Sequence, residues 1–451
     1  MQLFIEHTKA GESVKREVSS VNLLETVTHI GNTRSLITNI GKIEHLLAQE
    51  EIDGVEDKRS FWSSLFRILL KENPDFQRLI YNLDQDIAPV SLDPETVKEI
   101  YKDKIHASVS SFERFYNCEY QYFLEQTLGL ESFENIDLNS KVVGNFFHEV
   151  FEKLLDNPNL TSENFDDHLE SVLRDVDTSY ARYFTQDATA QFTWTNLGEI
   201  VKQTAVVLKK GLENAQMKTL ATESAFGLPQ SELGNFSIDN INLRGRIDRI
   251  DQFFDDSIGA IDYKSSQHKF DLASAYDGTS LQFLTYLDVL KQMNADQKLW
   301  GALYLQLKNE SINLSDVDYL GEIAALLAKK MRYEGLILEE YKDKVNQEID
   351  VVNINRNNVY SQEEFEGLIK LNESHYARAG ERLREGEIAI NPVMTKEGID
   401  KSGNVHGCRY CPLKSICRFE ASRHMNDYAR EVGQKSRKEI LEELKGGPVN
   451  D

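Results

Sequence analysis

The middle of the chain alternates between the hydrophobic patterns of strands and of helices. Runs rich in β-branched or alternating apolar residues predict strands at residues 219–226, 241–251, 258–264 and 299–307. Apolar residues at helical spacing predict helices at residues 110–129, 141–155, 280–293, 320–332 and 361–386. Because helices flank the strands on both sides along the chain, the pattern indicates an α/β or α+β domain with a covered sheet.

Composition narrows the class of protein. The 451 residues are 40% hydrophobic and 28% charged, and no apolar run is long enough to span a membrane, so we expect a cytoplasmic protein. A net charge of −23 opposes non-specific binding of nucleic acid. One basic stretch, from Val405 to Lys438, has eight Lys or Arg and three acidic residues. It fits a solvated helix face and a phosphate-contacting surface about equally well.

Charged residues interrupt two of the predicted strands. The first reads GRIDRID at residues 245–251, and the second reads AIDYKS a few residues later. A three-residue turn at residues 255–257 would place Asp248 opposite Lys264. Because side chains alternate along a strand, Asp248, Asp262 and Lys264 then share one face of the hairpin.

This cluster predicts chemistry. Two neighbouring carboxylates repel each other unless a cation lies between them, and hard oxygen ligands favour Mg²⁺ or Mn²⁺. A lysine on the same face can offset charge on a phosphate or orient a water molecule. The pattern therefore fits a metal-dependent phosphodiesterase. The alternative is a surface salt bridge between Asp248 and Lys264, and the spacing by itself favours this alternative.

Other polar residues surround the hairpin in the sequence. His148 follows Gly144 by one turn of a predicted helix, and Glu223 lies in the preceding strand, where it could supply a further carboxylate. Gln282 and Tyr286 share one face of the next helix. Taken singly, each has an ordinary interpretation, as a core or surface histidine or as part of a polar stripe. Their combined presence favours a site.

The four cysteines are unevenly distributed. Cys118 stands alone, and Cys408, Cys411 and Cys417 fall close together near the other end. Four cysteines are too few for a disulfide scaffold in a chain of this length, but their spacing is typical of metal ligands. It is compatible with both Zn²⁺ and a [4Fe–4S] cluster. Either centre would be structural, because it closes a loop of almost 300 residues.

These motifs together resemble a known family. G-x3-H, E-x2-F, GRIDRID, DYKS and Q-x3-Y occur in the order found in RecB-like nucleases of the PD-(D/E)xK superfamily, and the cysteines bracket them in the same way. The AddB/RexB-type B subunits of bacterial ATP-dependent helicase–nucleases are the most similar, over about residues 100–425. One departure is Glu119, where the family usually has proline after the first cysteine. We expect it to cause only local adjustment.

The resemblance implies a restriction-endonuclease-like mixed sheet flanked by helices, with helical additions held together by an iron–sulfur cluster. The metal ligands it implies for Mg²⁺, with Mn²⁺ as a substitute, are His148, Asp248, Asp262 and the backbone carbonyl of Tyr263. The catalytic residues it implies are Asp248, Asp262, Lys264, Gln282 and Tyr286. Among these, Lys264 would position or activate the attacking water, while Gln282 and Tyr286 would orient the DNA strand or support the metal ligands. For Cys118, Cys408, Cys411 and Cys417 it favours a [4Fe–4S] cluster.

The resemblance also implies a role and a partner. B subunits of this type cut the 5′-terminated strand of a broken DNA duplex while a helicase A subunit unwinds it, in preparation for homologous recombination. The chain has no GxxxxGK[ST] loop, so we expect no ATP binding through such a loop. The alternatives are a catalytically idle DNA-end-binding or scaffold subunit and a CRISPR-associated RecB-like nuclease.

Domain organisation follows from the same comparison. The family carries a long helicase-like portion before the nuclease, whereas only about 100 residues precede it here. We therefore expect a fragment, with a helical remnant or linker at residues 1–95, the nuclease domain at residues 96–430 and a charged tail at residues 431–451.

Overall fold

The computed structural model describes residues 5–7, 13–15, 71, 87, 91–131, 140–184, 188–214, 217–253, 255–265, 268–294, 296–307, 326, 333–348 and 356–445. Nearly all of the expected helical remnant lies outside these residues, as does the helix predicted at residues 320–332 apart from residue 326. Near the start of the chain, β1 (Ile5–His7) and β2 (Ser13–Lys15) form an antiparallel pair. The main sheet and its helices are formed between residues 91 and 445.

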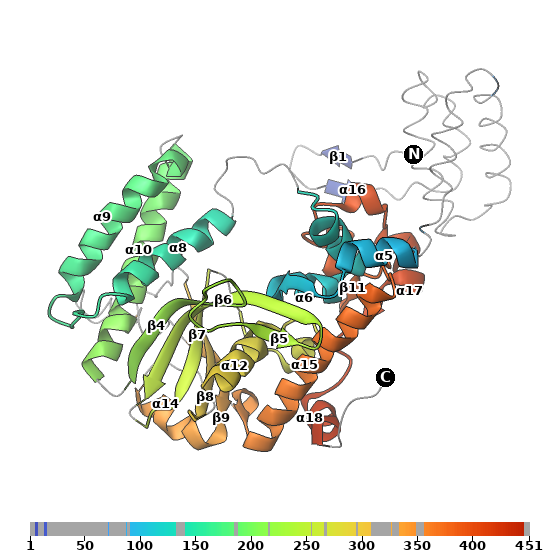
Figure 1. The fold of residues 1–451 in the computed structure, drawn as a ribbon. Helices are drawn as coiled ribbons and strands as arrows, with labels where there is room; N and C mark the ends of the chain where they lie inside the picture. Colours follow the sequence, from blue (N-terminus) through green and yellow to red (C-terminus); the bar gives the residue numbers. More distant parts are fainter. Residues whose placement is uncertain are drawn as a thin grey trace.

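An eight-stranded mixed sheet forms the centre of the structure (Figure 1). Its main path runs in the order β10 (Val359–Tyr360), β9 (Tyr333–Leu338), β8 (Leu299–Gln306), β7 (Ile258–Lys264), β6 (Ile241–Phe253) and β3 (Ile105–Ser108). Two further strands also pair with β6, namely β4 (Met217–Phe226) and β5 (Phe236–Ile238). The β6–β7 and β8–β9 pairs are antiparallel, and the β7–β8 and β3–β6 pairs are parallel. The predicted mixed sheet is therefore confirmed.

Helices cover both faces of the sheet around β7, which explains why this strand is buried along almost its whole length. The ring of Tyr263 stacks on Phe151 of α8 (Ser140–Leu155). The next residue, Lys264, instead contacts Gln282 of α12 (Gln282–Met293). Because successive side chains point to opposite faces, α8 and α12 lie on opposite sides of β7.

Further helices extend each layer. On the α8 side, α9 (Phe165–Phe184) and α10 (Ala188–Asn214) pack against each other and form the green group beside β4 in Figure 1. On the α12 side, α15 (Gln362–Arg384) packs against α12 and α5 (Pro94–Tyr101). Ser361 caps α15 through a capping box with Glu364, as expected for a helix that was predicted to begin there.

The helix predicted at residues 110–129 is interrupted, which corrects the prediction. Ser108 caps α6 (Val109–Asn117), and Cys118 then takes an extended conformation with φ −170°. Two short helical segments follow, α7 (Glu119–Tyr122) and the π-helix η2 (Phe123–Thr127). At the start of α6, Ser108 accepts the capping hydrogen bond from the Ser111 amide.

The C-terminal segment folds onto the domain. A parallel pair is formed by β11 (Val393–Met394) and β12 (Arg430–Glu431), with α16 (Lys414–Cys417) and α17 (Ala421–Tyr428) between them in the chain. The last described helix, α18 (Arg437–Lys445), packs against α15 and buries Ile440 in the main core. Residues 431–445, expected as part of a charged tail, thus contribute to the packing of the domain.

The basic stretch at residues 405–438 is largely engaged within the protein. Arg430 donates to the Tyr116 carbonyl, Lys435 pairs with Glu443 at 2.7 Å, and the guanidinium of Arg437 donates to two backbone carbonyls. These contacts favour a structural role for the stretch over a phosphate-contacting surface. Among the described helices, none is long and apolar enough to cross a membrane.

Candidate active site

The β6–β7 hairpin has a different register from the predicted one. Arg249 pairs with Ile261 and Gln252 with Ile258, so Asp248 lies level with Asp262 instead of Lys264. The pairing was wrong because the turn begins one residue earlier: the Phe253 amide donates to the Ser257 carbonyl. Asp256 closes this turn at φ 62°, a left-handed conformation that aspartate tolerates better than most residues.

Asp248, Asp262 and Lys264 still share one face of the hairpin, because a shift of two residues preserves the alternation of side chains. Lys264 Nζ lies 2.7 Å from Asp262 Oδ2, and the Tyr263 amide donates to Asp248 Oδ2 at 2.8 Å. Asp248 and Asp262 are both buried. The alternative of a surface salt bridge between Asp248 and Lys264 does not describe this arrangement, since Asp262 is the carboxylate that pairs with Lys264.

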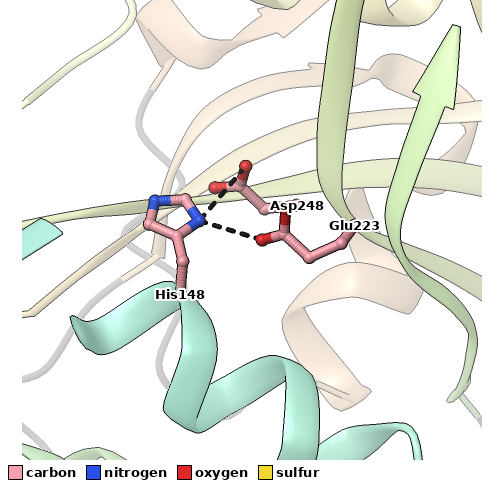
Figure 2. A group of neighbouring side chains, drawn as sticks. All are labelled: His148, Glu223 and Asp248. Atoms are coloured by element: carbon pink, nitrogen blue, oxygen red, sulfur yellow. Dashed lines mark hydrogen bonds and ion pairs between the residues drawn. The ribbon is translucent and has the colours of Figure 1, made fainter. Parts of the chain in front are cut away.

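His148, Glu223 and Asp248 converge from three different elements, α8, β4 and β6 (Figure 2). His148 Nδ1 lies 3.0 Å from Glu223 Oε1 and 3.6 Å from Asp248 Oδ1. One ligand atom from each residue lies within 4.8 Å of the others, so the three form a group able to hold a metal ion. The sequence suggested that Glu223 could supply a further carboxylate, and the fold places its carboxylate beside His148 and Asp248.

Glu223 has an unusual backbone conformation. Its neighbours pair regularly with β6, Thr222 with Arg249 and Ser224 with Ile247, so Glu223 lies level with Asp248. Its φ of 44° is left-handed, which costs a residue other than glycine on the order of 1–3 kcal/mol. Such strain between regularly paired neighbours is typical of functional sites, and it accompanies a side chain directed at His148.

Burial and crowding of charge perturb the acid–base properties of the site. Burial, together with the charge of Asp262, raises the pKa of Asp248 to about 8. Burial also raises the pKa of Asp262, although Lys264 acts in the opposite direction. Burial lowers the pKa of His148, but the hydrogen bond to Glu223 and the charge of Asp248 outweigh it and raise this pKa overall. The group thus holds more negative charge than it can stabilise alone, and a divalent cation fits it.

Lys264 is the first member of a hydrogen-bonded chain that leads into α12. Its Nζ donates to Gln282 Oε1 at 3.0 Å, and Gln282 Nε2 donates to the Tyr286 hydroxyl at 2.6 Å. Gln282 thus contacts both Lys264 on the hairpin and Tyr286. The ring of Tyr263 is buried, and its backbone carbonyl as a metal ligand stays a prediction.

The sequence did not predict the position of Glu113. Its Oε1 accepts hydrogen bonds from the backbone amides of Leu281 and Gln282, at 2.8 and 3.1 Å. A glutamate three residues after a serine is the usual pattern of a capping box within one helix. The carboxylate instead reaches the start of a helix 168 residues away along the chain.

The four cysteines lie around one cavity, with Cys118 directly after α6 and the other three in the C-terminal segment. Leu124, Leu413 and Phe419 also line the cavity, and none of the cysteines forms a disulfide. Burial and the neighbouring thiols raise the pKa of Cys408 to about 12, and burial raises that of Cys118 to about 11. Sulfur donors gathered around one cavity form the ligand set of a structural metal or iron–sulfur centre, and a bound cation would lower the pKa of these thiols.

Glu119 holds the segment that follows Cys118 in place. Its Oε1 lies 2.6 Å from an Arg382 nitrogen and accepts from Asn391 Nδ2 at 2.5 Å, while its amide donates to Asn391 Oδ1 at 3.0 Å. A network of hydrogen bonds thus fixes this position, where the family usually has the rigid ring of proline. That this departure causes only local adjustment stays a prediction.

Comparison with known proteins gives a consistent result. A family model described as the PD-(D/E)XK nuclease superfamily matches residues 106–418. Over 451 residues, the chain is 62% identical to the B subunit of the ATP-dependent helicase/deoxyribonuclease of Lactococcus lactis subsp. lactis, covering 100% of this chain and 41% of that protein.

Two further relatives extend the comparison. The exonuclease/helicase subunit RexB of Lactococcus lactis subsp. cremoris is 61% identical over 446 residues, which cover 99% of this chain and 40% of that protein. The B subunit of the ATP-dependent helicase/deoxyribonuclease of Streptococcus suis is 32% identical over 429 residues, which cover 93% of this chain and 37% of that protein. The chain thus spans about two fifths of the length of the curated relatives it matches.

Proposed function

The chain belongs to the PD-(D/E)XK nuclease superfamily, and on this premise we propose that it is a Mg²⁺-dependent exodeoxyribonuclease acting in the 5′→3′ direction. The observation that carries the proposal is the group formed by His148, Glu223 and Asp248, next to the Lys264–Asp262 pair. Nitrogen and carboxylate ligands beside a lysine suit metal-assisted hydrolysis of a phosphodiester.

The proposed metal ligands are His148, Glu223, Asp248, Asp262 and the backbone carbonyl of Tyr263. A bound Mg²⁺ supplies positive charge to the phosphate under attack. Two contacts hold the carboxylates in place without the ion: the Tyr263 amide donates to Asp248, and Lys264 pairs with Asp262. Mn²⁺ has the same preference for these ligands and is expected to substitute.

Lys264 is the proposed residue that positions the attacking water. The charge of Asp262 raises the pKa of the Lys264 amino group despite its burial, so this group stays protonated and donates hydrogen bonds. Gln282 accepts one of these bonds and thereby fixes the direction of the amino group, while Tyr286 fixes the Gln282 amide. The charge of Lys264 then also stabilises negative charge that develops on the phosphate.

The biological setting is proposed from the relatives. They are named as B subunits of ATP-dependent helicase/deoxyribonucleases or as an exonuclease/helicase subunit. We propose that this chain likewise works with a helicase A subunit in the cytoplasm and processes broken DNA ends for homologous recombination. The helicase-driven part of this activity requires that partner.

For the cysteine centre we propose a [4Fe–4S] cluster with a structural role. Support comes from the cavity shared by Cys118 and the three C-terminal cysteines, and from the resemblance to nucleases that carry such a cluster. Iron analysis and a visible absorption spectrum of anaerobically purified protein test this proposal. Colourless protein that contains zinc would contradict it.

The nuclease proposal is tested with single-stranded DNA in the presence of Mg²⁺, with and without the helicase subunit. The wild-type chain should degrade the substrate, and Asp262→Ala should abolish cleavage by removing both a metal ligand and the partner of Lys264. Its cysteine-bound metal should be unaffected, which shows that the variant is folded. Undiminished cleavage by Asp262→Ala would refute the site, and no cleavage by the wild type in either condition would favour a scaffold subunit.

A further inference from the structure

The start of α12 has an unusual cap. The first backbone amides of any helix lack acceptors within that helix and need other partners. The residue at the cap position is Leu281, whose side chain forms no capping hydrogen bond. Oε1 of Glu113, on α6, instead accepts from the amides of Leu281 and Gln282. The helix that carries Gln282 and Tyr286 is therefore capped by a residue from another helix.

The residue that this cap holds, Gln282, is hydrogen-bonded directly to Lys264. Gln282 is the first residue of α12, and its side chain accepts from Lys264, which pairs with Asp262. A fixed Gln282 backbone therefore fixes the position from which the Gln282 side chain reaches the Lys264 amino group. Hydrogen bonds of this kind, behind the groups that act, hold them in the required geometry.

The helix that carries Glu113 is itself held at both ends. It follows β3, which pairs with β6 so that Ser108 lies level with Arg244 on the strand that carries Asp248. At its other end lies Cys118, at the cysteine cavity. Because α6 also packs against α12, the Glu113 carboxylate is presented from a fixed support.

We propose that Glu113 is a positioning residue of the nuclease site, which sets the direction of the Lys264 amino group through the N-terminus of α12 and Gln282. This inference rests on the proposed nuclease function.

The test is a double-mutant cycle in the full chain with Mg²⁺ and single-stranded DNA. Glu113→Ala should lower kcat by about 10–100-fold, the range found for residues that orient acting groups, and leave KM unchanged. Glu113→Gln, which keeps an acceptor oxygen, should retain most of the activity. Because both residues act through one chain of contacts, Glu113→Ala combined with Gln282→Ala should be no slower than Gln282→Ala alone.

A matched control is Asp271→Ala. Asp271 is the local N-cap of α11 (Leu272–Tyr276), where its carboxylate accepts from the Ser274 amide at 3.0 Å, and it takes no part in the Glu113–Gln282–Lys264 chain of contacts. It should leave kcat unchanged. The proposal would be overturned if the double variant lost kcat by the product of the two single losses, or if Glu113→Ala had the kcat of the wild type. If Glu113→Ala does not fold, Glu113→Asp, which keeps the charge on a side chain one methylene shorter, replaces it in the same cycle.

A second readout does not depend on activity. Hydrogen exchange at the amides of Leu281 and Gln282 should accelerate in Glu113→Ala and stay slow in Asp271→Ala, while the cysteine-bound metal is retained in both. Unchanged exchange at these two amides would overturn the proposal even in an inactive chain. If Glu113→Ala shows this exchange effect while the wild-type chain cleaves no DNA, the nuclease function is refuted and the structural role of Glu113 stays intact.

Discussion

At the scale of single residues, the site is governed by competition between protons and a metal ion. Asp248 and Asp262 lie level on neighbouring strands, and both are buried. His148 gains a proton more readily than a free histidine because two carboxylates face it. Each of these residues must lose its proton before it can bind a metal, so protonation and metal binding are linked.

Metal affinity should therefore rise with pH. Because the pKa of Asp248 is about 8 without metal, the apparent affinity for Mg²⁺ should fall by up to about tenfold per pH unit below that value. The raised pKa of His148 acts in the same direction. Isothermal titration calorimetry between pH 6 and 9 measures both the affinity and the protons released. An affinity independent of pH would contradict the assignment of Asp248 as a ligand.

The same shift affects stability, with a sign that can be checked. A carboxyl group whose pKa is higher in the folded state stabilises the fold below its unfolded value, near 3.8, and this contribution is lost as pH rises towards 8. Metal-free protein should thus become less stable over this interval, and Mg²⁺ should restore stability at the upper end. Asp255→Asn should show the same loss of stability over this interval. The pKa of Asp255 is lowered, to about 2, so its titration lies outside the interval.

At the scale of elements, the strands and long helices could be predicted because burial on one or both faces leaves a regular hydrophobic pattern. The hairpin register could not, because it depends on the left-handed conformation of Asp256 in the turn. The break at Cys118 also leaves no pattern, since contacts with the C-terminal segment impose it on a sequence that favours a helix. Glu223 became part of the site through a similar local irregularity in β4.

The packing of β7 against β8 gives a prediction at this scale. A Cβ atom at Gly259 would overlap the indole ring of Trp300, which is fully buried. Gly259→Ala should therefore lower the free energy of unfolding by about 1–3 kcal/mol, as overpacking of a core does. Chemical denaturation measures this change. The control is Gly198→Ala in α10, where nothing lies within 4 Å, and where alanine should stabilise the helix by about 0.5–1 kcal/mol.

At the scale of the whole molecule, the two ends of the domain meet at the cysteine cavity, opposite in Figure 1 to the helices that follow α8. The spacing of the cysteines predicted this meeting, because ligands of one metal centre must lie together wherever they occur in the chain. The cap of α12 by Glu113 could not be predicted, because no spacing rule connects a glutamate to a helix 168 residues away. Motifs with strict ligand geometry are visible in a sequence, whereas hydrogen bonds that support them are not.

The cysteine centre should act as one cooperative unit. Cys118 and Cys408 are about 290 residues apart in the chain, so a centre that joins them holds α6 against the C-terminal segment. Cys118→Ser and Cys411→Ser should each release the bound metal, lower the melting temperature and expose residues 393–431 to limited proteolysis. Because both variants disrupt the same centre, the double variant should be no less stable than either alone. A Cys118→Ser protein that retains its metal and its melting temperature would show that the three C-terminal cysteines bind the metal without α6, and that the centre does not join the two ends.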